Sequence, residues 1–362
     1  VLNSNLLLTG KFNLGQKITL NARAGHDVVD INYNFQQTQG SELDIIGLTT
    51  LNNARVITQS SRRTQLRTMG IFGDATLGYD NFLYLTLTGR NDFASSVASG
   101  NRSFFYPSVS LAYVFSQHLR MPDWITYGKL RSSFARIGIA PVEPYLTNTY
   151  YNSAFGAPLN GVNGWTRDDV KGAEDLRPEF TDNREIGLEM QFLNNRLGFD
   201  LSLYQINSKD VINRVLVPTS TGFSSFVLNS GEVENKGIEL AINATPVRNN
   251  NFSWEINGNF TANRNEVVRI AEGLNEIVIA SQFGYLSSGA TQKWVVGQPA
   301  GGLYGIAYTR YYGSQTDDRV TVRRDLPLLI ASTGTNAGFP IRDATNQRLL
   351  GNSLPRFIYG IG

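Results

Sequence analysis

The segment Met69–Arg90 reads MGIFGDATLGYDNFLYLTLTGR and contains two alternating stretches joined by a tight polar turn at Asp80-Asn81. The second stretch places leucines at every other position, with polar or aromatic residues between them: Leu83, Leu85 and Leu87 against Tyr84, Thr86 and Thr88. Successive side chains of a β-strand point to opposite faces of a sheet, so this period of two predicts a pair of amphipathic strands. We therefore expect an antiparallel hairpin with one apolar face.

The same alternation recurs along the chain and predicts about ten strands. The predicted strands occupy residues 6–12, 17–25, 69–79, 83–90, 108–115, 129–134, 185–192, 197–204, 238–243 and 253–260. Allowing for ragged ends, their lengths fit the roughly 9–11 residues that a tilted transmembrane strand needs.

Short and long connections alternate without exception between these strands. The short ones are 13–16, 80–81, 116–123, 194–195 and 247–251, and the long ones are 26–64, 91–103, 138–182, 207–231 and 263–354. Every second connection of an antiparallel meander lies on the same rim, so the short turns share one rim and the long loops the other. Loops of such length are uncommon in a compact soluble domain, whereas short periplasmic turns and long extracellular loops are typical of outer-membrane barrels.

Aromatic side chains surround the short turns. They are Phe12, Tyr79, Phe82, Phe115, Trp124, Phe192, Phe199, Phe252 and Trp254. Most of them share the apolar parity of their strands, with Phe82 as the exception. This arrangement resembles the aromatic girdle that marks a membrane interface.

The polar positions of the predicted strands carry full charges, which a dry core does not tolerate without partners. We therefore expect a water-filled lumen to be faced by Arg23, Asp74, Arg131, Glu189, Asp200, Glu239 and Glu255. The predicted fold class is an all-β, transmembrane antiparallel β-barrel. The alternative is a β-sandwich of a soluble or surface adhesin, in which the apolar faces would pack against a second sheet.

Composition excludes several other classes of protein. The 362 residues carry a net charge of +2, contain no Cys, and are 41% hydrophobic. The small charge gives no reason to expect binding to nucleic acid, and disulfide or thiolate chemistry is impossible. Motifs of metalloproteases, serine hydrolases and nucleotide-binding enzymes are missing. The two histidines, His26 and His118, are predicted at opposite rims, so we do not expect an enzyme.

Two groups of residues on the long-loop side are candidates for substrate binding. Arg90, Asp92 and Phe93 cluster with Arg102 around one loop, where they would either contact a ligand or order the loop. The loop at 138–182 carries a set of aromatic residues among Asn and Gly: Tyr145, Tyr150, Tyr151, Phe155 and Trp165. Aromatic faces beside amides suit stacking on sugar rings or packing on peptides, and they equally suit a neighbouring loop or a partner protein.

The pair Asp317-Asp318 in the longest loop offers two adjacent carboxylates, and Ca²⁺ binds several carboxylate and carbonyl oxygens. The spaced Asp, Asn and Gly of an EF-hand-like loop are missing there, so a solvated turn is the preferred interpretation. No metal and no cofactor is expected.

Several segments resemble the SusC/RagA-type TonB-dependent transporters of Bacteroidota outer membranes. They include Ile71–Tyr79, Tyr84–Asp92, Phe105–Ser110 and Gly351–Phe357, and the most specific is GEVENKGIEL at Gly231–Leu240. The remaining matching segments are Gly128–Phe134, Leu176–Glu179 and Gly297–Gly305. The segments follow the family's order and span nearly the whole chain.

The resemblance implies part of a barrel of about 22 strands, with residues 1–362 forming a partial barrel domain from its later half. The N-terminal plug, the TonB-contacting region and the last strands are expected to lie outside these residues. It further implies TonB-dependent import of a glycan or peptide, with a SusD-like surface lipoprotein as partner and with membrane lipid and lipopolysaccharide around the wall.

Overall fold

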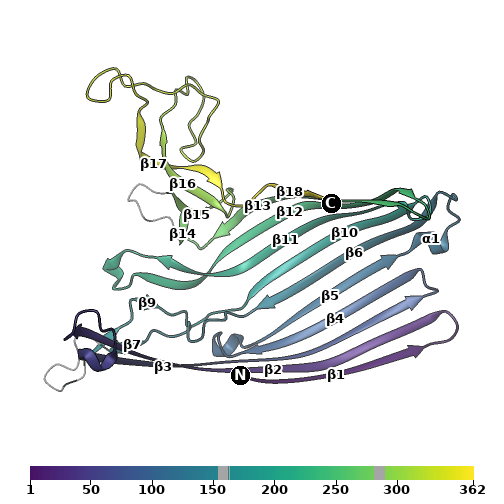
Figure 1. Cartoon of the computed structure of the whole chain (residues 1–362), viewed down its shortest axis with the longest axis horizontal. Coiled ribbons are helices and arrows are strands. Elements are labelled where there is room, and N and C mark those ends of the chain that lie inside the picture. Colours follow the sequence, from purple (N-terminus) through teal and green to yellow (C-terminus); the bar gives the residue numbers. More distant parts are fainter. Residues whose placement is uncertain (154–161, 163, 281–289) are drawn as a thin grey trace.

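The computed structural model describes residues 1–153, 162, 164–280 and 290–362. These residues form one long curved sheet with a smaller sheet standing on it (Figure 1). Among the helices of the described residues, none is both long and apolar enough to cross a membrane.

The large sheet is built from strands that follow one another in sequence order. They are β1 (Leu2–Asn13), β2 (Ile18–Leu43), β3 (Ala54–Tyr79), β4 (Leu83–Ala94), β5 (Ser103–Tyr113), β6 (Ile125–Ile139), β10 (Glu179–Phe192), β11 (Leu197–Leu216), β12 (Ser225–Arg248), β13 (Ser253–Ile270) and β18 (Phe357–Ile361). All neighbours along this path are antiparallel. Short β9 (Val170–Lys171) pairs in parallel with β12. The ten predicted strands are thus confirmed as β1–β6 and β10–β13.

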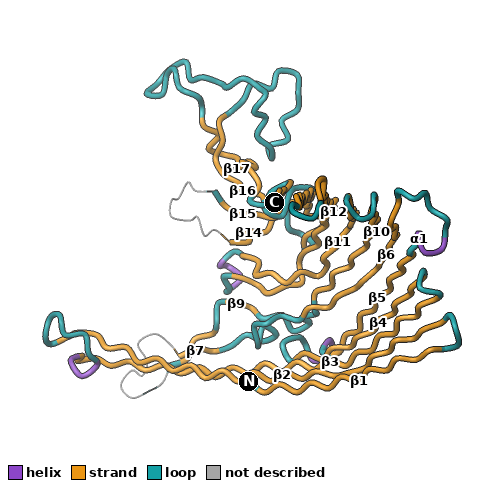
Figure 2. The backbone as a smooth tube through the Cα atoms, turned by 45° about the vertical axis from the view of Figure 1, so that its right-hand side comes forward, coloured by secondary structure: helices purple, strands orange, loops and turns teal. Residues whose placement is uncertain are grey.

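The strands are longer than predicted at the long-loop rim. β2 and β3 are 26 residues each, so residues 26–43 and 54–64, which were expected to be loop, are strand instead. Figure 2 shows this hairpin reaching beyond its neighbours. β11, β12 and β13 likewise extend into the segments predicted as loops at 207–231 and 263–354. The hydrogen-bonded strands continue beyond the apolar band of the wall. Apolar and polar residues no longer alternate in these extensions, so the period-two signal on which the prediction depended is missing from them.

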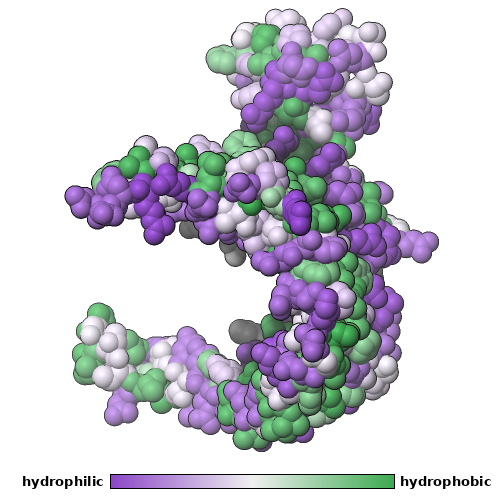
Figure 3. All heavy atoms as spheres, turned by 90° about the vertical axis from the view of Figure 1, so that its right-hand side faces the viewer, coloured by the Kyte–Doolittle hydropathy of each residue, from purple (hydrophilic) through white to green (hydrophobic). Residues whose placement is uncertain are grey.

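The apolar face of the large sheet is not packed against a second sheet. Leu85 and Leu201 are only partly buried, and the exposed fractions of Ile238 and Ile242 are 43% and 42%. Figure 3 shows apolar residues concentrated on the convex side of a C-shaped wall. A sandwich would have buried these side chains, so the barrel prediction is the one that the structure matches.

Aromatic side chains gather at the short-turn rim, as predicted. The Trp124 and Phe192 rings stack with centroids 5.6 Å apart, and Phe192 stacks on Phe199 at 6.0 Å. Phe82 departs from the apolar parity and stacks on His118 instead, at 4.4 Å. His118 lies in the short helix α1 (Phe115–His118) at this rim, whereas His26 lies within β2, so His26 is not the loop residue that was expected.

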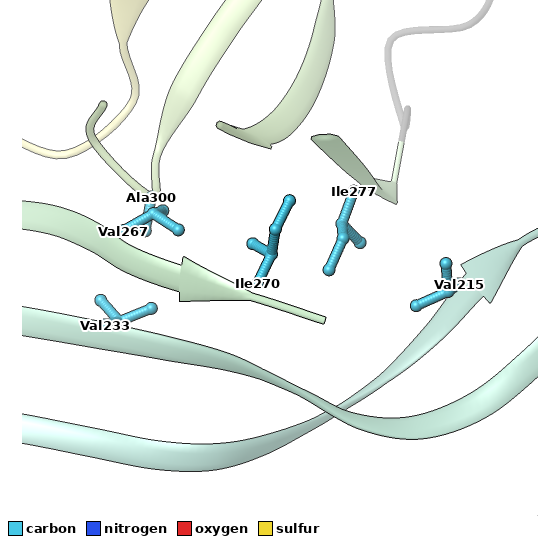
Figure 4. Close-up of a cluster of buried hydrophobic side chains, with 6 residues drawn as sticks. All are labelled: Val215, Val233, Val267, Ile270, Ile277 and Ala300. Atoms are coloured by element: carbon cyan, nitrogen blue, oxygen red, sulfur yellow. The ribbon is translucent and has the colours of Figure 1, made fainter. Parts of the chain in front are cut away.

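The longest loop contains a second sheet of four antiparallel strands. They are β14 (Glu276–Ala280), β15 (Thr291–Val295), β16 (Gly302–Tyr308) and β17 (Arg342–Asn352). Figure 4 shows the apolar cluster that joins this sheet to the upper ends of β11–β13, with Val215, Val233, Val267, Ile270, Ile277 and Ala300. This is a dry core, and it lies at the long-loop ends of β11–β13.

The remaining elements are short and belong to the loops. β7 (Tyr151–Ser153) and β8 (Trp165–Arg167) form a small hairpin, and three single-turn helices cover residues Leu51–Asn53, Ser99–Asn101 and Thr219–Thr221. They lie at the long-loop rim, where the candidate ligand contacts were predicted.

Candidate functional site

The inner face of the wall carries a charged cluster centred on Arg131 in β6. Its guanidinium donates to both carboxylate oxygens of Asp200 in β11, at 2.9 and 2.7 Å, and to Ser202 at 2.5 Å. Glu185 in β10 accepts a further bond at 3.3 Å. Gly187, the residue opposite Arg131 on β10, makes this reach possible, because a Cβ there would lie 2.5 Å from the guanidinium. Arg131 therefore spans two strands across a glycine gap.

Two other ion pairs line the same face. Lys129 contacts Glu189 at 2.6 Å, and Arg23 contacts Asp74 at 3.0 Å. In both pairs the partners lie directly opposite each other in register on neighbouring strands. Five of the seven residues predicted to face the lumen, together with Glu185, are therefore brought into cross-strand pairs that balance charge in a wet environment.

The remaining two, Glu239 and Glu255, have the inner parity without a described ion-pair partner. Glu239 lines a cavity of about 270 Å³ on β10–β13, whose other residues are Asn183, Glu185, Ser202, Tyr204, Ile206, Asn235 and Asn263. The Asn183 Oδ1 atom is buried there with no hydrogen-bond partner in the described chain. The cavity therefore offers carboxylate and amide oxygens to an incoming donor, such as a hydroxyl, an amide or a cation.

A second cluster lies on the same inner face, nearer the long-loop rim, around Arg90 in β4. The Arg90 guanidinium donates to Asp27 at 2.7 and 3.2 Å and to Asp92 at 2.7 Å. The Tyr106 hydroxyl donates to Asp92 at 2.5 Å, and the guanidinium carbon lies 5.6 Å from the centroid of the Phe72 ring. Phe72 shares the polar side of β3 with Asp74, and the contact with Arg90 accounts for an aromatic residue there. Asp27 and Tyr106 were not predicted as site residues, because only the register of β2 and β5 brings them to Arg90.

Phe93 does not join this cluster. It pairs with Met69 across β3 and β4, on the parity opposite to Arg90 and Asp92, and it is exposed. The three residues that were grouped by their closeness in sequence thus divide between the two faces of the wall.

The predicted loop aromatics divide into an anchored pair and an exposed pair. Tyr145 and Tyr150 meet edge to face at 6.1 Å, and the Tyr145 hydroxyl accepts a bond from the Gln65 backbone N–H. Tyr151 in β7 and Trp165 in β8 are 66% and 67% exposed. They belong to one hairpin, in which Tyr151 faces Arg167 and Trp165 faces Ser153. Phe155 lies outside the described residues.

The Asp317-Asp318 pair is engaged in protein contacts. Asp317 receives two bonds of 2.7 Å from the buried Arg348, whose guanidinium also contacts Asp343 at 3.0 Å. Hydrogen bonds from Arg348 hold the pKa of the Asp317 carboxyl well below its usual range. Asp318 accepts bonds from the Val320 and Thr321 backbone N–H groups. Within the described ranges, no group of three or more His, Asp or Glu is arranged to hold a metal ion.

Comparison with known proteins places these features in a family context. The family model described as TonB dependent receptor-like, beta-barrel matches residues 2–341. TonB-dependent receptor P3 of Formosa agariphila is 28% identical over 83% of this chain and 30% of its own length. TonB-dependent receptor SusC of Bacteroides thetaiotaomicron is 27% identical over 61% of this chain and 23% of its own length.

The wall also matches a solved structure. The RagAB peptide transporter superposes with a TM-score of 0.79 at 20% identity, over 99% of this chain and 39% of that one. This likeness concerns the fold. The chain spans less than a third of the length of the curated relatives that it matches.

Proposed function

Because this chain belongs to the TonB-dependent receptor β-barrel family and to its SusC/RagA-like branch, we propose that it forms part of a transporter importing a glycan or a peptide. The chain is an outer-membrane protein, and its antiparallel strands form a curved wall. The observation that carries the proposal is the division of this wall into an apolar outer face and an inner face of paired charges. Such a division is required of a barrel that holds water inside and lipid outside.

Residues 1–362 would contribute part of a barrel of about 22 strands, and the transport activity would belong to the whole protein. We expect TonB to supply the energy through another region and a SusD-like lipoprotein to cover the long-loop rim. The exposed Tyr151 and Trp165 on the β7–β8 hairpin would contact either the cargo or that partner. The whole protein would move its cargo without changing it chemically, since the relatives are receptors and transporters rather than enzymes.

Two cargo classes fit the inner wall. The RagAB neighbour is a peptide transporter, and the oxygen-rich cavity beside Glu239 would accept the N–H groups or the amine of a peptide. The same amides and the exposed aromatic rings would also bind a glycan by hydrogen bonds and stacking. The charged wall alone favours neither class.

Growth and uptake tests of the whole protein decide between them. A strain lacking the gene, and the same strain complemented with it, would be supplied with single glycans or peptide mixtures as sole nutrient. Complemented cells are expected to take up one class, and a protonophore or loss of TonB is expected to abolish that uptake. Uptake that persists without TonB would contradict energy coupling, and binding without uptake would favour an adhesin.

The site is tested by two variants in the complemented strain. The double substitution Tyr151→Ala with Trp165→Ala is expected to raise the cargo concentration needed for half-maximal uptake. The matched control is Tyr311→Ala, another exposed aromatic on the same side. Uptake that does not change in the double variant would remove these two rings from the proposed site.

A further inference from the structure

The outer face of the wall carries a row of cations. Arg184 in β10 pairs with Gln205 in β11, Gln205 pairs with Lys236 in β12, and Lys236 pairs with Arg264 in β13. Residues opposite each other in neighbouring strands share a face. All three cations are exposed, and they have the parity of the apolar outer face.

The row lies immediately above the apolar band. The next outward row toward the short turns is apolar and consists of Ile186, Leu203, Ile238 and Ala262. A groove of about 1000 Å³ is lined by both rows. The groove therefore combines an apolar surface with cations along its edge nearer the long loops. A binding site for an amphiphile needs both features.

The height of the cations corresponds to the boundary of a membrane. Arg184 lies eight residues from the short-turn end of β10, and Lys236 and Arg264 lie twelve and eleven residues from the corresponding ends of β12 and β13. At about 3.3 Å per residue and a strand tilt of about 40°, these positions are roughly 20–30 Å above the short turns. The apolar belt of such barrels is about 25 Å tall, so the cations are level with the headgroups of the outer leaflet.

The cations are not fully neutralised by the protein. Lys236 contacts Glu234 at 2.6 Å, and Arg264 contacts Glu266 at 3.3 Å. In the part of the chain that the structure describes, no carboxylate lies within ion-pair distance of Arg184. Arg356 and Glu185 also line the groove. Glu185 is bonded to Arg131, so the cations of the groove exceed the carboxylates that pair with them. A guanidinium without a carboxylate partner at a lipid boundary suits a phosphate, which it can bind through two hydrogen bonds.

We propose that this groove binds a phosphorylated lipid of the outer leaflet, lipid A being the form tested. The acyl chains lie against Ile186, Leu203 and Ile238, and the phosphates contact the cations above them. The inference depends on the outer face meeting lipid and not on the transport of any cargo.

The test uses the whole protein purified in detergent, with lipid A and dephosphorylated lipid A as probes and native mass spectrometry as the readout. The triple variant R184Q/K236Q/R264Q is expected to weaken lipid A binding by roughly a hundredfold. The matched control R120Q/R196Q/R248Q removes three exposed cations near the short turns and is expected to bind like the wild type. Dephosphorylated lipid A is expected to bind the wild type weakly.

Three results would overturn the proposal: equal binding of lipid A by the triple variant, equal binding of the dephosphorylated form, or complete displacement by inorganic phosphate. The last would indicate a free anion site without a lipid component. Heat-dependent migration on a gel shows whether each variant is folded. If the triple variant does not fold, the single variant R184Q replaces it, with an expected loss of roughly fivefold.

Discussion

Arg131 shows how single residues of the inner wall depend on partners two strands away. Its side chain is 28% exposed, and it neutralises Asp200 and Glu185 together. Lys17 makes a simpler pair with Asp80 at the short-turn rim, and the two side chains are 60% and 43% exposed. Removing a partly buried charge partner is costly because the remaining carboxylates stay desolvated without a donor, whereas an exposed pair contributes little.

We therefore expect Arg131→Gln to lower the free energy of unfolding by roughly 1–3 kcal/mol. Lys17→Gln is expected to lower it by much less. Both are measured by urea unfolding of the protein in lipid vesicles. Equal losses for the two variants would show that the Arg131 cluster is as solvated as an ordinary surface pair.

Asp317 predicts a pH dependence outside the membrane. Its pKa is lowered in the folded state, chiefly by bonds from Arg348, so its contribution to stability is fully present above its unfolded pKa of about 4. That contribution is lost as the pH falls below this value. Protease cleavage within residues 309–341 is expected to increase below about pH 4 in the wild type and to be high already at pH 7 in Asp317→Asn.

The control for this prediction is Asp325→Asn, which removes an exposed carboxylate paired with Arg323 in the same loop. We expect its cleavage at pH 7 to match that of the wild type. If both variants are cleaved alike, the Arg348 contacts do not hold the loop together.

Among the elements, β10 depends on a glycine at the point where the Arg131 side chain crosses it. A Cβ at Gly187 would lie 2.5 Å from the Arg131 Nε and Cζ atoms, and the nearest atoms belong to no other side chain. We expect Gly187→Val to displace Arg131 and to destabilise the wall by roughly as much as Arg131→Gln. Gly73→Val is the control, because its nearest neighbour would be a backbone oxygen at 3.6 Å.

The double variant Gly187→Val with Arg131→Gln tests the mechanism of this element. If the glycine serves only to admit the guanidinium, the two losses will not add, since the second change removes a group that is already displaced. Additive losses in urea unfolding would assign Gly187 a separate role in the backbone of β10.

At the scale of the whole molecule, the barrel fold requires that the convex face of the wall contacts lipid. Arg or Lys on the lipid face costs about 2–4 kcal/mol at the bilayer midplane and about 0–1 near the interface. Leu201 lies four residues above the short-turn end of β11 and Gln205 lies eight above it, both on the outward parity. We expect Leu201→Arg to destabilise the protein by about 2–4 kcal/mol and Gln205→Arg by about 0–1 kcal/mol. Similar losses at both heights would mean that no membrane gradient crosses this face.

The sequence by itself determined which residues belong to strands within the apolar layer, which face each one takes, and where the short turns and their aromatic rings lie. These features are local: side chains alternate with a period of two, and Leu83, Leu85 and Leu87 show it without knowledge of any partner. Alternation of apolar and polar residues stops where both faces of β2 and β3 meet water, so the sequence did not predict the outer parts of these two strands. Phe93 was grouped with Arg90 and Asp92, but it lies on the opposite face of β4, because closeness along the chain does not determine the face.

Only the tertiary structure decided which charges meet. Arg131 reaches Asp200 across β10, Arg90 reaches Asp27 across β3, and Arg348 in β17 reaches Asp317, 31 positions earlier in the chain. The physical reason is that alternation sets the face of a residue but not its partner, which depends on the register between strands and on diagonal neighbours. The same register aligns Arg184, Lys236 and Arg264 into a single row on the outer face.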